Sequence, residues 1–229
     1  MLEFLHRCRQ QASHLILLGD MFEYLAGSNR TSHRAYAQVL RALAAWEQVD
    51  YVEGNHDFDL LADRLGVPGL CLHPEPTVAD RSGLRIGLLH GDGCNPDDLG
   101  TRALKRALKS SGVRWLRDRI LPDPLVHHFA MAEFRRRQTW PGRNEESQAV
   151  LRHARQWQAS AKLDLVLFAH THQAHLECSE SACLVNPGAA QPGGSYAWLD
   201  DQGLSIRGFP DGQLRQGPVP LDVRGRSGA

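Results

Sequence analysis

The stretch His14-Leu15-Ile16-Leu17-Leu18-Gly19-Asp20 decides the fold, because four aliphatic residues run directly into a glycine and an aspartate. A short apolar run bounded by a turn signal predicts a buried β-strand. The aspartate stands at the point where this strand would end. The stretch therefore predicts a strand with a carboxylate at its carboxyl end.

The same pattern recurs three times farther along the chain. Apolar runs at 49–53, 84–89 and 163–168 are each followed by polar residues, and longer helical patterns separate them. This alternation predicts an α/β sandwich, and ligand-binding groups of α/β sheets usually lie at the carboxyl ends of the strands. The polar clusters are Gly54-Asn55-His56-Asp57, His90-Gly91-Asp92 and His170-Thr171-His172.

Other segments give coarser expectations. A helix is predicted from Thr31 to Glu47 with Ser32 as its N-cap, and the first ten residues have an amphipathic helical pattern. Beyond residue 172 short strands alternate with turns, and the glycine- and proline-rich stretch 208–219 is predicted to be turns. We expect one domain over 1–219 and a flexible tail over 220–229.

Composition limits the classes of function. Twenty-six basic residues balance twenty-six acidic ones, so net charge predicts no nucleic-acid partner. The five cysteines lack C-x-x-C spacing, so the sequence indicates neither a disulfide framework nor a thiolate zinc site, a pattern that suits a reducing compartment. No apolar run approaches the roughly 20 residues of a membrane-spanning helix. We expect a cytoplasmic protein, attached to a membrane surface at most.

The residues after the four strands are typical metal ligands. One carboxylate, one amide oxygen and three imidazoles suit a divalent ion such as Mn²⁺, Zn²⁺ or Fe²⁺. Each group alone is more often a turn or a surface residue, whereas their combination and order favour a metal site. The candidate ligands are Asp20, Asn55, His90, His170 and His172.

These four blocks resemble the G-D-x-x-[DE], G-N-H-[DE], H-G-[DE] and [GA]-H-x-H motifs of the calcineurin-like metallophosphoesterases, in the family's order. The resemblance implies a four-layer α/β/β/α sandwich of two mixed sheets and two divalent metal ions, with Mn²⁺ first and Zn²⁺ or Fe²⁺ as alternatives. It implies that Asp20 bridges both ions, that His172 binds one, and that Asn55, His90 and His170 bind the other. It further implies that His56 stabilises or protonates the leaving group and that Asp57 orients the His56 ring.

One family motif is absent. The family opens with a D-x-H block on its first strand, and no such block precedes Asp20. We expect that strand and two ligands to be missing from this sequence. Two explanations stay open: a start codon assigned too late, or a degraded homologue that serves as a binding scaffold. The DNA upstream of Met1 separates them.

The segment between His90 and His170 is too long for a plain loop, so we expect a helical lid at about 95–161. Helical patterns occur at 98–110, 123–138 and 143–161. Residues 93–161 hold thirteen Lys or Arg against seven Asp or Glu. A solvated helix face and a surface for an anionic substrate or membrane both explain this excess. The candidate substrate-binding residues are Arg102, Lys105, Arg106 and Lys109, on one helical face.

Apolar residues of the lid either pack a helical hairpin or line an acyl-chain groove. They are Leu125, Val126, Phe129, Met131 and Phe134.

The segments 19–24, 90–98 and 121–123 resemble one branch of the family, the UDP-2,3-diacylglucosamine pyrophosphatase-like proteins of lipid A synthesis. The resemblance implies hydrolysis of a nucleotide–lipid pyrophosphate by a cytoplasmic enzyme peripheral to the inner membrane. The best-known members of that branch have Arg at the position of His56, which is a departure from their pattern. Alternatives are a phosphodiesterase or phosphatase of soluble nucleotides and an inactive scaffold.

Overall fold

The computed structural model describes residues 1–27, 29–81, 83–95, 110–137, 143–180 and 182–221. The chain forms two compact units. The first comprises residue 1, 75–91 and 144–229, and the second comprises 2–74 and 92–143. The predicted mixed α/β architecture with several sheets is confirmed. No helix among the described residues is long and apolar enough to cross a membrane.

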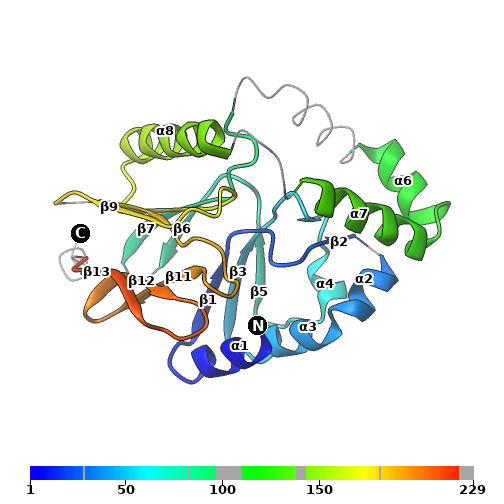
Figure 1. Cartoon of the computed structure of the whole chain (residues 1–229), viewed down its shortest axis with the longest axis horizontal. Helices are drawn as coiled ribbons and strands as arrows, with labels where there is room; N and C mark the ends of the chain where they lie inside the picture. Colours follow the sequence, from blue (N-terminus) through cyan, green and yellow to red (C-terminus); the bar gives the residue numbers. More distant parts are fainter. Residues whose placement is uncertain (28, 82, 96–109, 138–142, 181, 222–229) are drawn as a thin grey trace. The chain divides into compact units, whose positions relative to one another are not determined.

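The second unit is built on a three-stranded parallel sheet in the order β1-β3-β5 (Figure 1). It also contains a short parallel pair, β2 and β4. Side chains of α1, α3 and β3 are fully buried in it, among them Leu5, Leu43 and Tyr51. The elements of this unit are α1 (Leu2–Arg9), β1 (His14–Leu17), β2 (Leu25–Ala26), α2 (Arg30–Ala35), α3 (Ala37–Leu43), β3 (Gln48–Val52), β4 (Asp57–Phe58), α4 (Ala62–Leu65), β5 (Leu70–His73), α6 (Ser111–Arg119) and α7 (Asp123–Arg137).

The single helix predicted from Thr31 to Glu47 is wrong in two respects. Tyr36 leaves helical geometry, with φ −102° and ψ 11°, and divides the segment into α2 and α3. The N-cap is Asn29 rather than Ser32, because the Asn29 side-chain oxygen accepts a hydrogen bond from the Ser32 backbone N–H at 2.9 Å. Both residue types cap helices well, so the sequence alone does not separate them.

Polar and apolar contacts join helix α7 to the rest of the second unit. The Arg30 backbone N–H donates to the Asp123 carboxylate at 2.8 Å, and the Ser32 hydroxyl lies 3.0 Å from His127 Nδ1. Val126 and Met131 pack against a buried cluster formed by Tyr24, Ala26 and Phe58. Two of the predicted lid residues therefore belong to a core.

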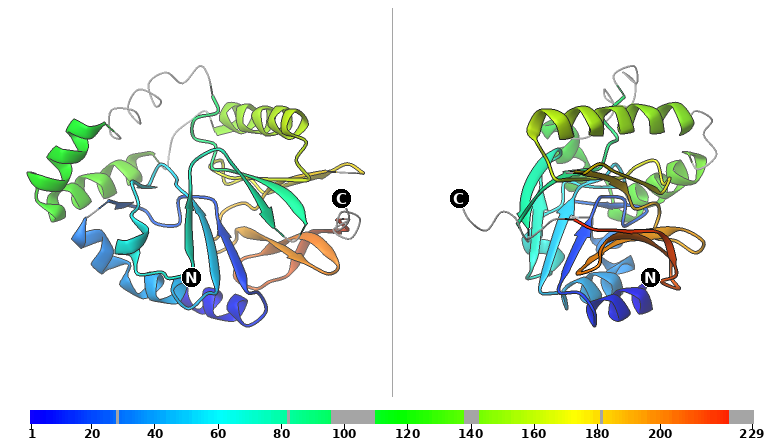
Figure 2. Two further views of the ribbon diagram at one scale, coloured as in Figure 1. Left: turned by 180° about the vertical axis from the view of Figure 1, so that it is seen from behind. Right: turned by 90° about the vertical axis from the view of Figure 1, so that its left-hand side faces the viewer.

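The first unit contains a five-stranded mixed sheet in the order β6-β7-β8-β10-β9 and a three-stranded antiparallel sheet in the order β11-β12-β13. Helix α8 lies along the five-stranded sheet in all three ribbon views (Figures 1 and 2). Gly87 makes this approach possible, because a Cβ there would lie 2.8 Å from the Trp157 ring of α8. The elements are β6 (Thr77–Arg81), β7 (Leu84–Leu89), α8 (Arg143–Ala161), β8 (Leu165–Phe168), β9 (His175–Cys178), β10 (Cys183–Asn186), β11 (Ser195–Asp200), β12 (Gly203–Gly208) and β13 (Leu214–Val219).

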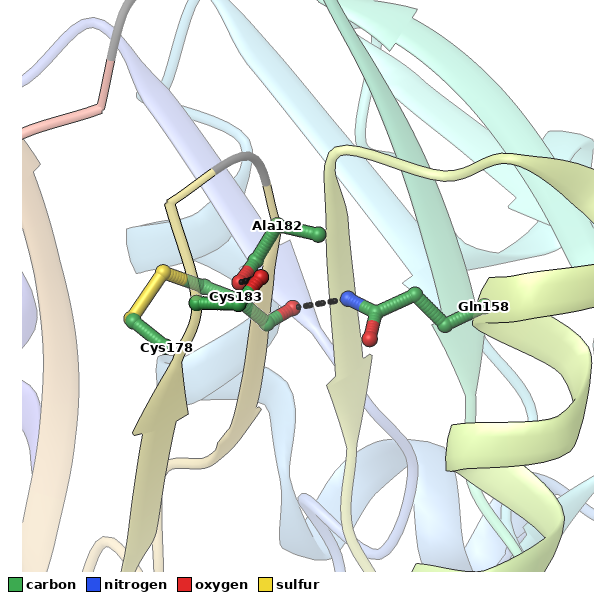
Figure 3. Close-up of a disulfide and its surroundings, with 5 residues drawn as sticks. Gln158, Cys178, Ala182 and Cys183 are labelled. Atoms are coloured by element: carbon green, nitrogen blue, oxygen red, sulfur yellow. Dashed lines mark hydrogen bonds between the residues drawn. A yellow bond between two sulfur atoms is a disulfide. The ribbon is translucent and has the colours of Figure 1, made fainter.

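Two expectations fail in the first unit. Residues 214–219 form strand β13 rather than a turn, because they pair with β12. Cys178 and Cys183 form a disulfide, although the cysteine spacing indicated none. They occupy facing positions on the antiparallel strands β9 and β10, and the Cys183 carbonyl accepts from the Gln158 side chain of α8 at 2.8 Å (Figure 3).

Candidate metal centre

The predicted site residues Asp20, Asn55, His56 and Asp57 lie in the second unit, at the ends of β1 and β3. These strands pair in parallel, with Leu17 opposite Tyr51, so their following loops leave the same edge of the sheet. The Asp20 carboxylate accepts a hydrogen bond from the His56 backbone N–H at 2.9 Å. The structure therefore brings the first two motifs together, as the strand-end argument predicts.

Gly54 is required by this close approach. A Cβ built at this position would lie 2.2 Å from Asp20 Oδ1 and 2.5 Å from the Asp20 backbone nitrogen. Contacts this short exclude any side chain. The lack of a side chain at Gly54 thus allows the Asp20 carboxylate to approach the His56 backbone N–H.

Asp57 has a different role from the predicted one. Its carboxylate is fully buried and accepts hydrogen bonds from the Tyr51 hydroxyl at 2.6 Å and from four backbone N–H groups. None of these five donors is the His56 ring, which instead lies 3.9 Å from the Asp20 carboxylate through Nε2. The prediction that Asp57 orients His56 through its ring is therefore wrong. The backbone donors are those of Asp20 (2.9 Å), Met21 (2.8 Å), Phe22 (3.4 Å) and Gly54 (2.8 Å).

The electrostatics of this loop favour a bound cation. Burial and the nearby Asp20 charge raise the pKa of Asp57 to about 7, although the hydrogen bonds from Tyr51 and the backbone oppose the rise. Two carboxylates at one place repel each other when both are ionised. A divalent ion on Asp20 would relieve this repulsion, so the residues fit a metal ligand role.

His90 and His170 meet at the strand ends of the first unit. Strands β7 and β8 pair in parallel with Leu89 opposite Phe168, so the next loops leave the same edge. The His90 ring is almost completely buried, and its Nε2 lies 3.3 Å from His170 Nδ1. Two ligands bound at about 2.0–2.1 Å to one ion stand about 3.3 Å apart, so this pair fits a shared metal ion.

Glu146 was not among the predicted site residues. It lies in the first turn of α8, and its carboxylate is 2.9 Å from His170 Nε2. A carboxylate on the outer nitrogen keeps a proton there and leaves Nδ1 free to bind a metal. The sequence gives no sign of this contact, because an acidic residue in a first helical turn is common.

His172 is exposed, and the turn that carries it is held by Asn186. The Asn186 side-chain amide donates to the Thr171 hydroxyl at 3.0 Å, and its oxygen accepts from the Gly188 backbone N–H at 2.9 Å. Asn186 is itself buried at the end of β10. It fixes the turn on which the H-x-H pair stands.

Three of the five candidate ligands have backbone conformations that favour glycine. The φ angles are 54° for Asp20, 68° for His170 and 58° for His172. Non-glycine residues pay about 1–2 kcal/mol in the left-handed region. Such outliers cluster at functional sites, so their coincidence with the predicted ligands supports a functional role.

The predicted lid contains the remaining candidate residues and several exposed apolar side chains. The substrate-binding candidates Arg102, Lys105, Arg106 and Lys109 lie outside the described residues, as does all of the predicted helix 98–110 except its last residue. Helix α6 follows them and was not predicted. The exposed apolar side chains of α6 and α7 include Trp115, Leu125 and Phe129, and Ile120, directly after α6, is exposed as well.

Comparisons with known proteins identify the family of this chain. The family model described as calcineurin-like phosphoesterase matches residues 1–174. The chain therefore belongs to the calcineurin-like phosphoesterases, a metallophosphoesterase family, and membership implies divalent metal ions.

Its relatives include proteins named UDP-2,3-diacylglucosamine hydrolase. One from Aeromonas salmonicida is 32% identical over 154 residues, which cover 66% of this chain and 59% of that protein. One from Chromobacterium violaceum is 30% identical over 220 residues, which cover 92% of this chain and 90% of that protein. Among solved structures, the chain is similar to Yfce, a phosphoesterase from E. coli, with 18% identity, a TM-score of 0.49, and coverage of 96% of this chain and 93% of that one.

Proposed function

We propose that this chain hydrolyses a phosphoester or pyrophosphate bond with two divalent metal ions, Mn²⁺ first among the candidates. The observation that carries the proposal is the His90–His170 pair, whose facing nitrogens are 3.3 Å apart and whose outer nitrogen is backed by Glu146. By the family's motif pattern, the ligands are Asp20, Asn55, His90, His170 and His172.

The roles of the other residues follow from their contacts. Bound ions would supply Lewis-acid chemistry and a water of lowered pKa. We assign proton donation to a leaving oxygen to the His56 ring, because it is partly exposed and lies 3.9 Å from the Asp20 carboxylate. Asp57 positions that loop through its hydrogen bonds to the backbone on either side of Asp20. It is a positioning residue.

For the substrate we propose a nucleotide–lipid pyrophosphate of the UDP-2,3-diacylglucosamine type. The names of the relatives support this substrate. Exposed apolar side chains on α6 and α7 also support it, because an acyl chain needs apolar surface; Trp115 is 59% and Phe129 65% exposed. In the same proposal, Arg102, Lys105, Arg106 and Lys109 bind the phosphates or an anionic membrane surface, and the protein is cytoplasmic and peripheral to the inner membrane.

Hydrolysis of UDP-2,3-diacylglucosamine by the purified chain tests the proposal. With Mn²⁺ added, water should split the pyrophosphate into UMP and a lipid monophosphate. His90→Ala should abolish turnover, because it removes one nitrogen of the metal pair. Turnover of soluble nucleotides alone would favour a phosphodiesterase or phosphatase. Less than one bound metal per chain and no hydrolysis of either substrate would leave a binding scaffold.

A second test concerns the apolar residues of α7. Phe129→Ala should raise KM for the lipid substrate several-fold and leave hydrolysis of a soluble phosphodiester unchanged, because only the acyl chain contacts this surface. The matched control is Leu214→Ala, an exposed apolar residue on β13 at 56% exposure. Equal effects of both variants on the lipid substrate would rule out the acyl-chain role of α7.

A further inference from the structure

Four polar side chains share one face of the parallel sheet β1-β3-β5. Asp50 lies opposite Ile16 on β1 and opposite Cys71 on β5. Facing residues of parallel strands point to the same side, and so do residues two apart on one strand. His14, Asp50, Cys71 and His73 therefore lie on one face. Strands of parallel sheets are usually apolar throughout, so a carboxylate in the middle strand requires a reason.

The carboxylate of Asp50 stands between the two imidazoles. Its side chain is completely buried, with Oδ2 at 2.7 Å from His14 Nε2 and Oδ1 at 2.7 Å from His73 Nε2. Donor atoms of Asp50, Cys71 and His73 all lie within 4.8 Å of one another. This cluster shares no residue with the phosphoesterase motifs, although His14 and Asp50 stand on the strands β1 and β3 that precede two of them.

The donor set is typical of a zinc-type site. Thiolate and imidazole with a carboxylate select Zn²⁺ or Co²⁺ over Mn²⁺, which prefers oxygen ligands. Metal–ligand bonds of about 2.0–2.3 Å in a tetrahedron place the ligand atoms about 3.3–3.8 Å apart. The donor atoms of Asp50, Cys71 and His73 need shifts of about 1 Å or less to reach this spacing, within the range of side-chain rotation. His14 lies outside this group of three; its Nε2 is 2.7 Å from Asp50 Oδ2, and its ring must turn toward the other two side chains to complete the site. Cys71 is exposed, so an ion can enter from solvent.

We propose that Asp50, Cys71 and His73, with His14 as the fourth ligand, bind a zinc-type divalent cation at a site distinct from the phosphoesterase metal centre. The ion joins β1, β3 and β5, because each strand contributes at least one ligand. The site is structural: its four protein ligands close the tetrahedron and leave no open position for a substrate.

Cobalt binding tests the proposal directly, because the proposed site includes a cysteine and the candidate ligands of the phosphoesterase centre do not. The candidate ligands of the phosphoesterase centre are oxygens and nitrogens, so a thiolate-to-Co²⁺ charge-transfer band in the near ultraviolet reports a bound cysteine, and the variants below identify which one. The full reduced chain should show the band at one Co²⁺ per chain. Cys71→Ser and His73→Ala should lose it. Cys94→Ser, which changes another free cysteine, and His90→Ala, which changes the phosphoesterase centre, should retain it.

Zn²⁺ should also stabilise the chain through these residues. A free Zn²⁺ concentration of about 100 times Kd raises the folding equilibrium constant about 100-fold when the unfolded chain does not bind the ion. Because Zn²⁺ at the phosphoesterase centre would also stabilise the fold, the comparison is made in His90→Ala: the increase should persist in that variant and vanish when Cys71→Ser is added to it. Absence of the charge-transfer band in the unsubstituted chain, or the same band in Cys71→Ser, would overturn the proposal and leave the cluster as a set of hydrogen bonds around Asp50.

Discussion

The hydrogen bond from Tyr51 to Asp57 is the contact whose removal tests the loop architecture most sharply. Both side chains are fully buried, and the hydroxyl lies 2.6 Å from Asp57 Oδ2. Burial and the charge of Asp57 raise the pKa of Tyr51 well above its usual value, so Tyr51 stays protonated and donates. Tyr51→Phe removes this donor and keeps the ring that fills the core.

The expected loss depends on the charge of Asp57. A hydrogen bond to an ionised group contributes about 1.5–3 kcal/mol to stability, and one between neutral groups about 0.5–1.5 kcal/mol. The pKa of Asp57 is about 7 in the folded chain, above its ordinary value of 3.8. Between these values the folded chain holds a proton that the unfolded chain has lost, so this group lowers stability as pH rises toward about 7. Tyr51→Phe removes a bond that lowers this pKa, and so its cost should grow as pH rises through 7.

Urea unfolding of metal-free protein, about one pH unit below and one above 7, measures the effect. We expect Tyr51→Phe to cost about 1 kcal/mol at the lower pH and about 2 kcal/mol at the higher one. In an Asp57→Asn background the cost should not vary with pH. An equal cost at both pH values in the unsubstituted background would refute the account of an ionising carboxylate held by Tyr51.

Two further variants test other contacts. Arg117→Ala should destabilise the second unit by about 3–5 kcal/mol in urea unfolding, because Arg117 and Asp59 form a 3.0 Å ion pair with both side chains under 10% exposed. Arg155→Ala, at an exposed pair, should cost at most about 1 kcal/mol, and equal losses would contradict the burial argument. Glu146→Gln should weaken Mn²⁺ binding about 10–100-fold in calorimetry, because the His170 ring loses its carboxylate partner; unchanged affinity would remove Glu146 from the site.

The strand-end residues were predictable from sequence, and their supporting contacts were not. Apolar runs followed by polar residues identify strands and their carboxyl ends, so His90 and His170 were expected to be neighbours, as they are. Glu146 contacts His170 from helix α8. The sequence predicts this helix but does not specify where it packs, so the contact could not be predicted. The motif predicted that Asp57 lies at the site. Its hydrogen bonds could not be predicted, because they depend on the backbone conformation at Asp20.

Contacts that depend on strand register were also missed. Cys178 and Cys183 face each other only because β9 and β10 pair in one particular register. The cluster around Asp50 requires the registers of three parallel strands at once. Periodicity within each strand gives the face of a residue, but no local pattern gives its partner on the next strand. The sequence therefore shows which residues are unusual and leaves their grouping to the fold.

Among the described residues, three of the five non-glycine residues with positive φ are candidate ligands; the other two are Asp59 and Lys162. Asp20, His170 and His172 have φ between 54° and 68°, where glycine would cost less than any other residue. At about 1–2 kcal/mol each, these three residues lower the stability of the fold by several kcal/mol in total. A fold optimised for stability alone would carry glycine at such positions, as it does at Gly19, next to Asp20. These positions carry a carboxylate and two imidazoles in spite of the lower stability. This is expected of side chains that are needed for binding rather than for folding.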